Sequence, residues 1–380
     1  MIPYGQQSIS DEDIEAVVAV LRSDYLTQGP KVPLFEDAVA TATDAQHAVA
    51  LNSATSALHI ACLALDLGSG DRLWTSPITF VASANCARYC GASVDFVDID
   101  PKTYNMCAIA LSEKLEQAEK TGTLPKVIVP VHLAGQSCDM RAISKLAKKY
   151  GIKVLEDASH AIGARYCDQP VGDCAYSDIA VFSFHPVKIV TTAEGGVATT
   201  NDAALARRMR YLRTHGVTRD QDLMLKDDGP WYYQQLELGY NYRMTELQAA
   251  LGVTQMDRLD SFVSRRRALA KRYETLLSDL PLQRPYQDPE TYSSFHLYIV
   301  RVASERHLDV FTSLREQEIG VNLHYIPVHL QPYYERMGFA PGNFPNAEQY
   351  YAEAISIPVY AGMSDAQQDE VVAKLTKALD

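Results

Sequence analysis

Lys188 stands in a sequence context that is unusual for a lysine. It follows the apolar run Ile179–Phe184 and a turn that contains Pro186, whereas most other lysines of the chain fall in polar helix or loop patterns. Lysine is almost never fully buried unless it is paired, and a desolvated amine has a lowered pKa and becomes a usable nucleophile and base. A lysine that reaches from a strand end to solvent fits the same local pattern, so both interpretations stay open at this point.

Two further groups of polar residues come directly after predicted buried strands. Asp157 follows Val154–Leu155, and the segment Asn52–Ser56 connects a strand to a helix. A carboxylate at a strand end can keep a pyridine nitrogen protonated, and small hydroxyl residues with free amides at a helix N-terminus bind phosphate. Taken singly, each group is also explained by ordinary helix capping, which is the more common role of such residues.

Together, these residues are what pyridoxal phosphate (PLP) requires of a protein. The cofactor needs a lysine for a Schiff base, a carboxylate at its ring nitrogen, a phosphate cradle and a side chain against its ring. Ligands of parallel α/β sheets bind at the carboxyl ends of the strands, where Lys188 and Asp157 are predicted to lie. We therefore expect PLP as the cofactor, with Lys188 and Asp157 as the catalytic residues.

The elements that must position these residues alternate between strand and helix. Short apolar runs predict strands at 47–51, 73–75, 94–97, 126–131, 153–155 and 179–184. Helical periodicity follows several of them, and a capping-box pattern at Ser10 and Asp13 predicts an N-terminal helix. Alternation of this kind predicts an α/β fold with a mostly parallel sheet flanked by helices.

The pattern changes near residue 245. A long helix is predicted over 245–280, with Arg265–Arg267 as a solvated face, and a strand over 295–302. A helix up to Gly320, the segment 321–326 and a last capped helix from Ser364 to about Leu379 follow. These observations predict a large PLP-binding domain over 1–245, and a linking helix with a smaller C-terminal α/β domain over 246–380.

Composition and missing motifs exclude several functional classes. The formal net charge of −12 over 380 residues argues against a nucleic-acid binder. None of the seven cysteines forms a Cys-x-x-Cys pair, so no metal site is expected. Glycine-rich dinucleotide, P-loop and serine-hydrolase motifs are also missing from the sequence. Without a secretion signal or a long apolar run, we expect a cytoplasmic protein without membrane contact.

Several sequence blocks, taken in order, resemble one known family. They are Tyr25–Pro30, Asn52–Ser56, Thr79–Ala82, Glu156–His160, Ser183–Lys188, Glu194–Gly196, Gly239–Met244 and His324–His329. The chain resembles the nucleotide-sugar aminotransferases of the DegT/DnrJ/EryC1/StrS family, which have the aspartate-aminotransferase fold (type I). The resemblance covers nearly the whole chain, and a set of blocks in this order is far more specific than any one block.

The resemblance implies a role for each matching position. Lys188 forms the Schiff base and Asp157 pairs with the pyridine nitrogen. The remaining cofactor positions are Phe80 against the ring, Thr55, Ser56 and Ser183 at the phosphate, and His160 near the ring hydroxyl, where relatives often have Gln. Asn241 reaches the cofactor phosphate of the partner subunit, which implies a homodimer with shared active sites.

The amino-acid sequences of the blocks at 183–188 and 324–329 are most similar to those of the pseudaminic-acid branch of the family. That likeness implies transfer of an amino group from glutamate to C4 of a UDP-linked 4-keto-6-deoxy-N-acetyl sugar. Candidates for the sugar side are His329, Tyr325 and Arg219. Each of them also has an ordinary structural explanation.

Other activities stay open. One alternative is an aminotransferase for another nucleotide-linked 3- or 4-keto sugar. A second is a PLP-dependent sugar dehydratase of the same fold, but histidine commonly replaces the lysine there, and Lys188 is present. A cysteine desulfurase would need a catalytic cysteine on a loop, and a non-enzymatic regulator would not need the complete set of Lys, Asp and phosphate-binding residues.

Overall fold

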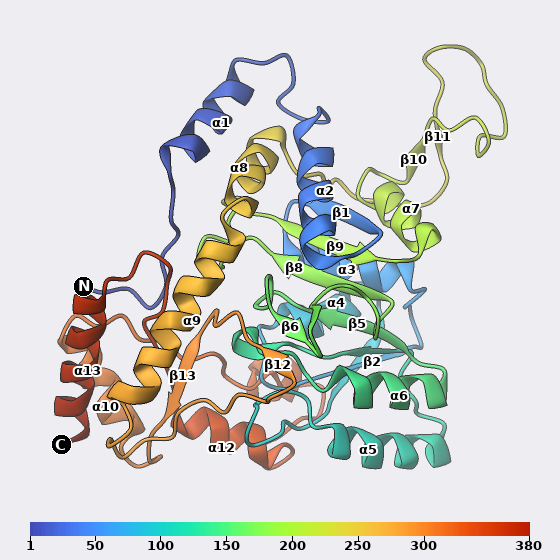
Figure 1. Ribbon diagram of the computed structural model, residues 1–380. Helices are drawn as coiled ribbons and strands as arrows, with labels where there is room; N and C mark the ends of the chain where they lie inside the picture. The colour runs from blue at the N-terminus through green and yellow to red at the C-terminus, as the bar shows by residue number, and fades with distance from the viewer.

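The computed structural model describes all 380 residues and is built around a seven-stranded sheet (Figure 1). The strand order is β1-β9-β8-β5-β4-β2-β3. The strands are β1 (His47–Leu51), β2 (Arg72–Thr75), β3 (Ser93–Phe96), β4 (Val127–Val129), β5 (Lys153–Asp157), β8 (Ile179–Ser183) and β9 (Gly196–Thr200). Neighbours from β3 to β8 pair in parallel, whereas β9 is antiparallel to both β8 and β1. The mostly parallel α/β sheet expected from the sequence is confirmed.

Helices cover both faces of this sheet, because its strands are apolar on both sides. Every residue of β4, β8 and β9 is buried, as is typical of strands enclosed between two helical layers. Successive residues of β1 point to opposite faces: Val49 belongs to the core that includes α3 (Ala54–Ala64), α4 (Ala82–Tyr89) and α7 (Ala203–Leu212). Ala48 packs with α2 (Lys31–Thr43) on the other face, where α5 (Ala108–Thr121) and α6 (Met140–Tyr150) cover β2, β4 and β5.

The N-terminal helix α1 (Asp11–Leu21) is anchored by a buried carboxylate. The capping box at Ser10 and Asp13 is present. Asp13 is also buried and accepts hydrogen bonds from Thr254 (2.6 Å) and Gln255 (2.7 Å), and pairs with Arg258. These contacts hold α1 against α8, and the two helices lie side by side in Figure 1.

The predicted helix over 245–280 is two helices, α8 (Glu246–Met256) and α9 (Leu259–Leu276). The break falls at Arg258, whose backbone leaves the helical region (φ −105°, ψ 4°) while its side chain turns to Asp13. Thr245 is the N-cap of α8. Because a helix begins there, we keep 246–380 as the proposed C-terminal unit.

The C-terminal residues build a core of their own. The strand pair β13 (Tyr298–Arg301) and β14 (Ala354–Ile357) is antiparallel and packs with α9, α10 (His307–Glu316) and α13 (Asp365–Leu379). The strand predicted at 295–302 is therefore shorter than expected. A further helix, α12 (Pro345–Glu353), leads into β14. None of the helices combines the length and apolar character needed to cross a membrane.

Arg266 corrects one expectation about α9. The triplet Arg265–Arg267 was predicted to be solvated, but Arg266 is only 1% exposed. It lies on the same helix face as Phe262 and Leu269 and donates hydrogen bonds to the carbonyl oxygens of Phe295, His296 and Val359 (3.2, 3.2 and 2.9 Å). A buried guanidinium is tolerated here because carbonyl groups accept its protons.

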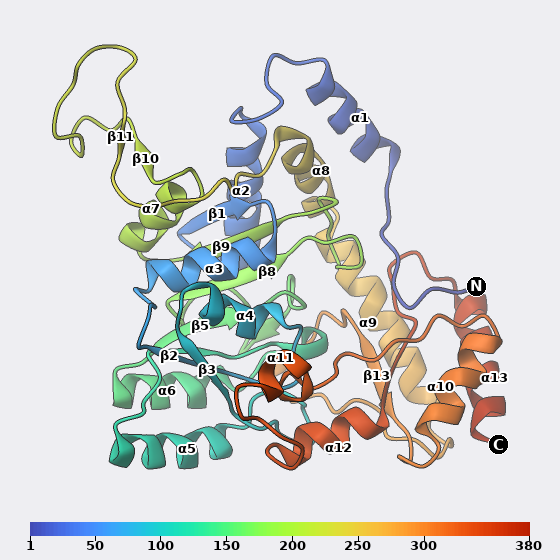
Figure 2. The ribbon, with the colours of Figure 1, turned by 180° about the vertical axis from the view of Figure 1, so that it is seen from behind.

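A hairpin at β10 (Val217–Thr218) and β11 (Gln234–Gln235) projects away from the rest of the molecule (Figure 2). Its connecting loop carries Arg219 and exposed apolar side chains, which include Leu225 and Trp231.

Candidate active site

A cavity of about 500 Å³ lies at the carboxyl ends of β5 and β8. It is lined by Asp157 and Ser159–His160 after β5, and by Ser183 and Lys188 at and after β8. The start of α3, the segment before α4 and residues 322–325 of the C-terminal unit complete the wall. The sheet thus brings together residues that are distant in sequence, as expected for strand ends of an α/β fold.

Lys188 lies on the turn after β8. Its backbone N–H donates to the carbonyl oxygen of His185 at 2.9 Å, and its side chain is half-buried in the cavity wall. Burial lowers the pKa of Lys188 to about 8, although the negative charge of Asp157 opposes the shift. The amine is therefore much closer to neutrality at physiological pH than an exposed lysine, as a Schiff-base lysine requires.

Asp157 ends β5 as a buried carboxylate, 5% exposed. One of its oxygens accepts a hydrogen bond from the Ser83 hydroxyl at 2.5 Å, and the other accepts from the Ser159 N–H at 3.1 Å. The Ser83 hydroxyl also contacts that of Thr79 at 2.6 Å. The carboxylate is thus fixed by donors on two sides while it faces the cavity.

The start of α3, which the sequence predicts as a phosphate cradle, borders the cavity. Ser53 is the N-cap, and its hydroxyl accepts from the Ser56 N–H at 3.1 Å. A Cβ on Gly196 would lie 2.4 Å from the backbone of Ser53 and Ala54, so glycine in β9 allows the start of α3 to lie directly against that strand. Thr55 and Ser183 line the cavity, whereas Ser56 is buried and donates to the Asn52 side chain at 2.7 Å.

Phe80, His160 and Tyr325 also reach the cavity. The Phe80 ring is 57% exposed, and its centroid lies 6.1 Å from that of Tyr325. His160 is buried and its Nε2 lies 3.0 Å from the Tyr325 hydroxyl. An aromatic face and a polar pair thus border the space in front of Lys188.

Besides Ser56, three expected residues lie outside this cavity. His329 is fully buried beside Phe344, and its Nε2 lies 3.0 Å from Glu348 Oε1. It packs as part of the core, and we no longer consider it a candidate for the sugar. Arg219 and Asn241 are exposed, on or near the projecting hairpin, and neither contributes to the wall of the cavity.

The cavity wall also contains residues that were not predicted from the sequence, which include Tyr4, Glu194, His296, Asn322 and His324. Glu194 and His324 fall inside sequence blocks that were recognised, so their position could have suggested them. Tyr4 and His296 lie outside these blocks, and nothing in their local sequence indicates a role in the site. Only the tertiary fold brings them to Lys188.

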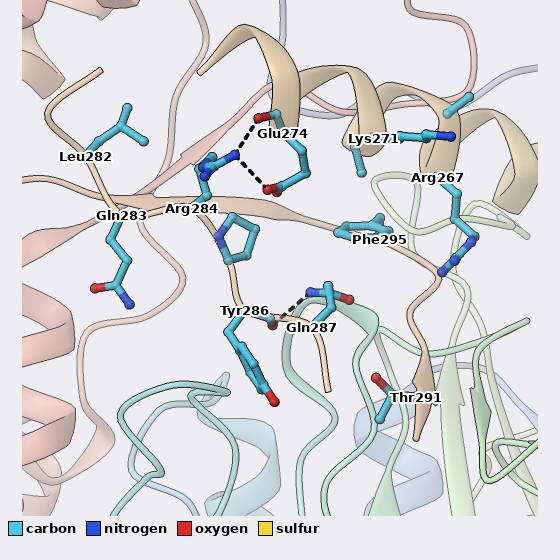
Figure 3. Close-up of a pocket in the computed structure, with 13 residues that line it drawn as sticks. Arg267, Lys271, Glu274, Leu282, Gln283, Arg284, Tyr286, Gln287, Thr291 and Phe295 are labelled. Carbon is cyan, nitrogen blue, oxygen red and sulfur yellow. Dashed lines mark hydrogen bonds and ion pairs between the residues drawn. The ribbon is translucent and has the colours of Figure 1, made fainter. Parts of the chain in front are cut away.

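A larger cavity, of about 1040 Å³, lies between α9 and residues 282–295 (Figure 3). Arg284 forms an ion pair with Glu274 there at 3.2 Å, and Lys271 is exposed. The lysine of this cavity is exposed to solvent, so the cavity has no equivalent of the desolvated Lys188 beside Asp157. The smaller cavity is the candidate active site.

Comparison with known proteins gives a match over almost the entire chain. The model of the DegT/DnrJ/EryC1/StrS aminotransferase family matches residues 7–376. The chain belongs to this family. It is a PLP-dependent sugar aminotransferase, as the sequence predicted.

Among curated proteins, this aminotransferase is 40% identical to the spore coat polysaccharide biosynthesis protein SpsC of Bacillus subtilis, over 98% of this chain and 95% of that protein. Among solved structures it is similar to a putative sugar aminotransferase of Streptococcus pneumoniae in a PMP form. The TM-score is 0.91 and the identity 30%, over 100% of this chain and 99% of that one. A second similar structure is Helicobacter pylori PseC, an aminotransferase of pseudoaminic acid biosynthesis. Its TM-score is 0.90 and its identity 32%, over 100% of this chain and 99% of that one.

The residues present fit the cofactor of this aminotransferase family. The cavity combines a desolvated lysine, a buried carboxylate with a free approach to the cavity, and a helix N-terminus with hydroxyl side chains. Solved relatives from Streptococcus pneumoniae have PLP and PMP forms. The fold, the enzyme class and the cofactor predicted from the sequence are therefore confirmed.

Proposed function

We propose that this aminotransferase moves an amino group from glutamate to the C4 keto group of a UDP-linked 4-keto-6-deoxy-N-acetyl sugar, in pseudaminic acid biosynthesis. The observation that carries the aminotransferase chemistry is Lys188, with its lowered pKa, in one cavity with Asp157. The sequence blocks at 183–188 and 324–329 and the similarity to PseC support the substrate.

The identity to SpsC, 40%, favours a second candidate. SpsC is named for spore coat polysaccharide biosynthesis. A different nucleotide-linked keto sugar, destined for a surface polysaccharide, is therefore the alternative substrate. A sugar dehydratase of the same fold is less favoured, because Lys188 is in place.

We assign the site residues by their positions. PLP, when bound, supplies an electron sink that stabilises the carbanion formed when a proton leaves the amino-bearing carbon. Asp157 would hold the ring nitrogen protonated, and Thr55, Ser56 and Ser183 would hold the phosphate. Phe80 would lie against the ring, and His160 would lie on the side of the ring hydroxyl. Lys188 would hold the cofactor at Nζ, and its amine would move a proton at the reacting carbon.

We also propose that the enzyme is a cytoplasmic homodimer in which Asn241 of each chain reaches the cofactor phosphate of its partner. The exposed position of Asn241, outside the cavity of its own chain, is compatible with this contact. Arg219 and Tyr325 stay candidates for the sugar side.

The direct test is incubation of the purified, PLP-loaded enzyme with glutamate and a set of UDP- and TDP-linked 3- and 4-keto sugars. Mass spectrometry detects the amino sugar, and NMR assigns the aminated carbon. A product aminated at C4 of the UDP-linked N-acetyl sugar, preferred over the other sugars, supports the proposal. Amination of another sugar supports the alternative, and loss of water without amination supports a dehydratase.

A further inference from the structure

A chain of three polar groups runs from the loop at 133–135 to the cavity. The Ala134 N–H donates to His160 Nδ1 at 3.2 Å, and His160 Nε2 lies 3.0 Å from the Tyr325 hydroxyl oxygen. A backbone amide can only donate, so Nδ1 must carry a lone pair. In a neutral imidazole the proton is then on Nε2, and it is donated to the oxygen of Tyr325. The hydroxyl proton of Tyr325 is left for another acceptor.

The surroundings of this series of hydrogen bonds keep the side chains of His160 and Tyr325 neutral. Burial, together with the positive charge of Lys188 and the proximity of His324, lowers the pKa of His160 well below its ordinary value. Burial also raises the pKa of Tyr325, with further contributions from Asp157 and Tyr4. His296 packs against His160 with ring centroids 4.4 Å apart, and burial lowers its pKa as well. Tyr325 is therefore a hydrogen-bond donor and not a base.

The backbone holds the first member of the chain in place. Ala134 has a left-handed conformation (φ 60°), which is unfavourable for a residue with a Cβ and persists only where the surroundings hold it. Two backbone bonds from the C-terminal unit supply this restraint: Leu297 N–H to Ala134 O (3.3 Å) and Ser294 N–H to Gly135 O (3.1 Å). The loop therefore presents a fixed donor to His160.

The last member of the chain opens into the active site. Tyr325 lines the cavity together with Lys188, Asp157 and Phe80, and its hydroxyl has no hydrogen-bond partner other than His160. We propose that Tyr325 donates its proton in a hydrogen bond to an electron-rich oxygen of the bound cofactor or of the keto sugar, and that His160 is a positioning residue that acts through Tyr325. This proposal rests on the proposed function, because it takes its acceptor from the ligands of that reaction.

The first test uses the cofactor-free protein and needs no activity. Nitrogen-15 NMR of histidine-labelled protein should show His160 as the neutral Nε2–H form throughout pH 5.5–9, and Tyr325→Phe should shift the Nε2 resonance alone. Lys188, His296 and His324 also face the ring of His160. The variant His296→Asn removes the resonances of His296 and so separates them from those of His160. A His160 that carries its proton on Nδ1, or that becomes an imidazolium in this range, would overturn the chain of donors.

The second test is a double-mutant cycle on the PLP-loaded enzyme. Tyr325→Phe should slow a half-reaction by about 10- to 100-fold. This is the effect of losing one hydrogen bond to an oxygen that is charged or that gains negative charge during the reaction. His160→Ala should do the same, but add less than about 3-fold to Tyr325→Phe, because the two act as one unit. His160→Gln should restore most of the rate, since an amide can accept from Ala134 and donate to Tyr325. Additive losses, or no loss in Tyr325→Phe, would refute the proposal.

The two half-reactions distinguish the source of the acceptor oxygen. If the oxygen belongs to the cofactor, Tyr325→Phe shifts the visible absorbance of the resting enzyme and slows the half-reaction with glutamate. If it belongs to the sugar, the spectrum and the glutamate half-reaction stay unchanged, and only the half-reaction with the keto sugar slows. A wild-type enzyme without any glutamate half-reaction contradicts the proposed function, whereas the NMR test still decides the donor chain by itself.

Discussion

At the scale of single residues, the site depends on how the fold surrounds each ionisable side chain. Lys188 is desolvated and its pKa falls to about 8, whereas Asp157 accepts hydrogen bonds from the Ser83 hydroxyl and the Ser159 N–H. A strand end supplies both environments within one cavity. The histidines beside them are driven toward neutrality; the pKa of His324, for example, is lowered to about 3.

Replacing Lys188 with Ala should remove the covalent link to the cofactor and nearly all transamination. The side chain is half-buried on a turn, not in a core cluster, so the fold should stay intact. Borohydride reduction followed by peptide mapping measures the first effect, and circular dichroism checks the second. Reduced cofactor on another lysine would show that the Schiff-base residue is misassigned.

The lowered pKa of Lys188 also predicts how stability depends on pH. Between pH 8 and about 10.5 the unfolded chain binds more protons at this residue than the folded chain, so the stability of the cofactor-free protein rises with pH in this window. Lys188→Met should be more stable than wild type at pH 7, and this advantage should shrink as the pH approaches 10.5. Thermal melts at several pH values test this, with the substitution Lys271→Met at an exposed lysine as the matched control.

Asp157→Asn should slow the loss of the substrate proton by about 100-fold or more, because the neutral amide does not keep the ring nitrogen protonated. Its contacts with Ser83 and Ser159 can partly persist, so the affinity for the cofactor should fall much less than the rate. Single-turnover spectroscopy with glutamate and a cofactor titration measure the two effects. A near-normal rate would mean that Asp157 only caps the turn after β5.

At the scale of elements, the sequence predicted the strands whose signal is local. The apolar runs at 47–51, 153–155 and 179–184 all became strands of the sheet, and the capping boxes at Ser10 and Ser364 are present. The antiparallel place of β9, the break between α8 and α9 and the burial of Arg266 depend on contacts distant in sequence. Local periodicity carries no information on such contacts.

Arg266 allows a test of the contribution of contacts that are distant in sequence. Arg266→Met leaves three carbonyl groups at Phe295, His296 and Val359 without their donor and should lower the free energy of unfolding by about 2–4 kcal/mol. The neighbouring Arg265 is partly exposed and pairs with Asp365 at 2.8 Å, so Arg265→Met should cost about 1 kcal/mol or less. Urea denaturation of both variants provides the comparison, and equal losses would contradict the buried role of Arg266.

At the scale of the whole molecule, a single chain leaves an apolar part of its surface without a contact. The hairpin around β10 and β11 projects from the body (Figures 1 and 2). Large apolar side chains in and next to it are exposed: Leu225 is 91% exposed, Trp231 72% and Leu238 78%. Exposed apolar groups on a projecting segment are typical of an interaction surface. The proposed homodimer gives this segment, and Asn241 next to it, a partner.

Mixing two inactive variants tests this arrangement. A Lys188→Ala chain has no amine for the cofactor, and an Asn241→Ala chain has a weakened contact to the cofactor phosphate. If Asn241 acts in the partner's site, each heterodimer contains one site with both defects and one site with neither, because a two-fold axis repeats the contact at each site. Activity should then recover to about half that of wild type per heterodimer, provided that the two sites are independent. Tags of different kinds on the two chains allow heterodimers to be purified and subunit exchange to be verified. If purified heterodimers stay as inactive as the parent variants, Asn241 serves the site of its own chain or no site at all.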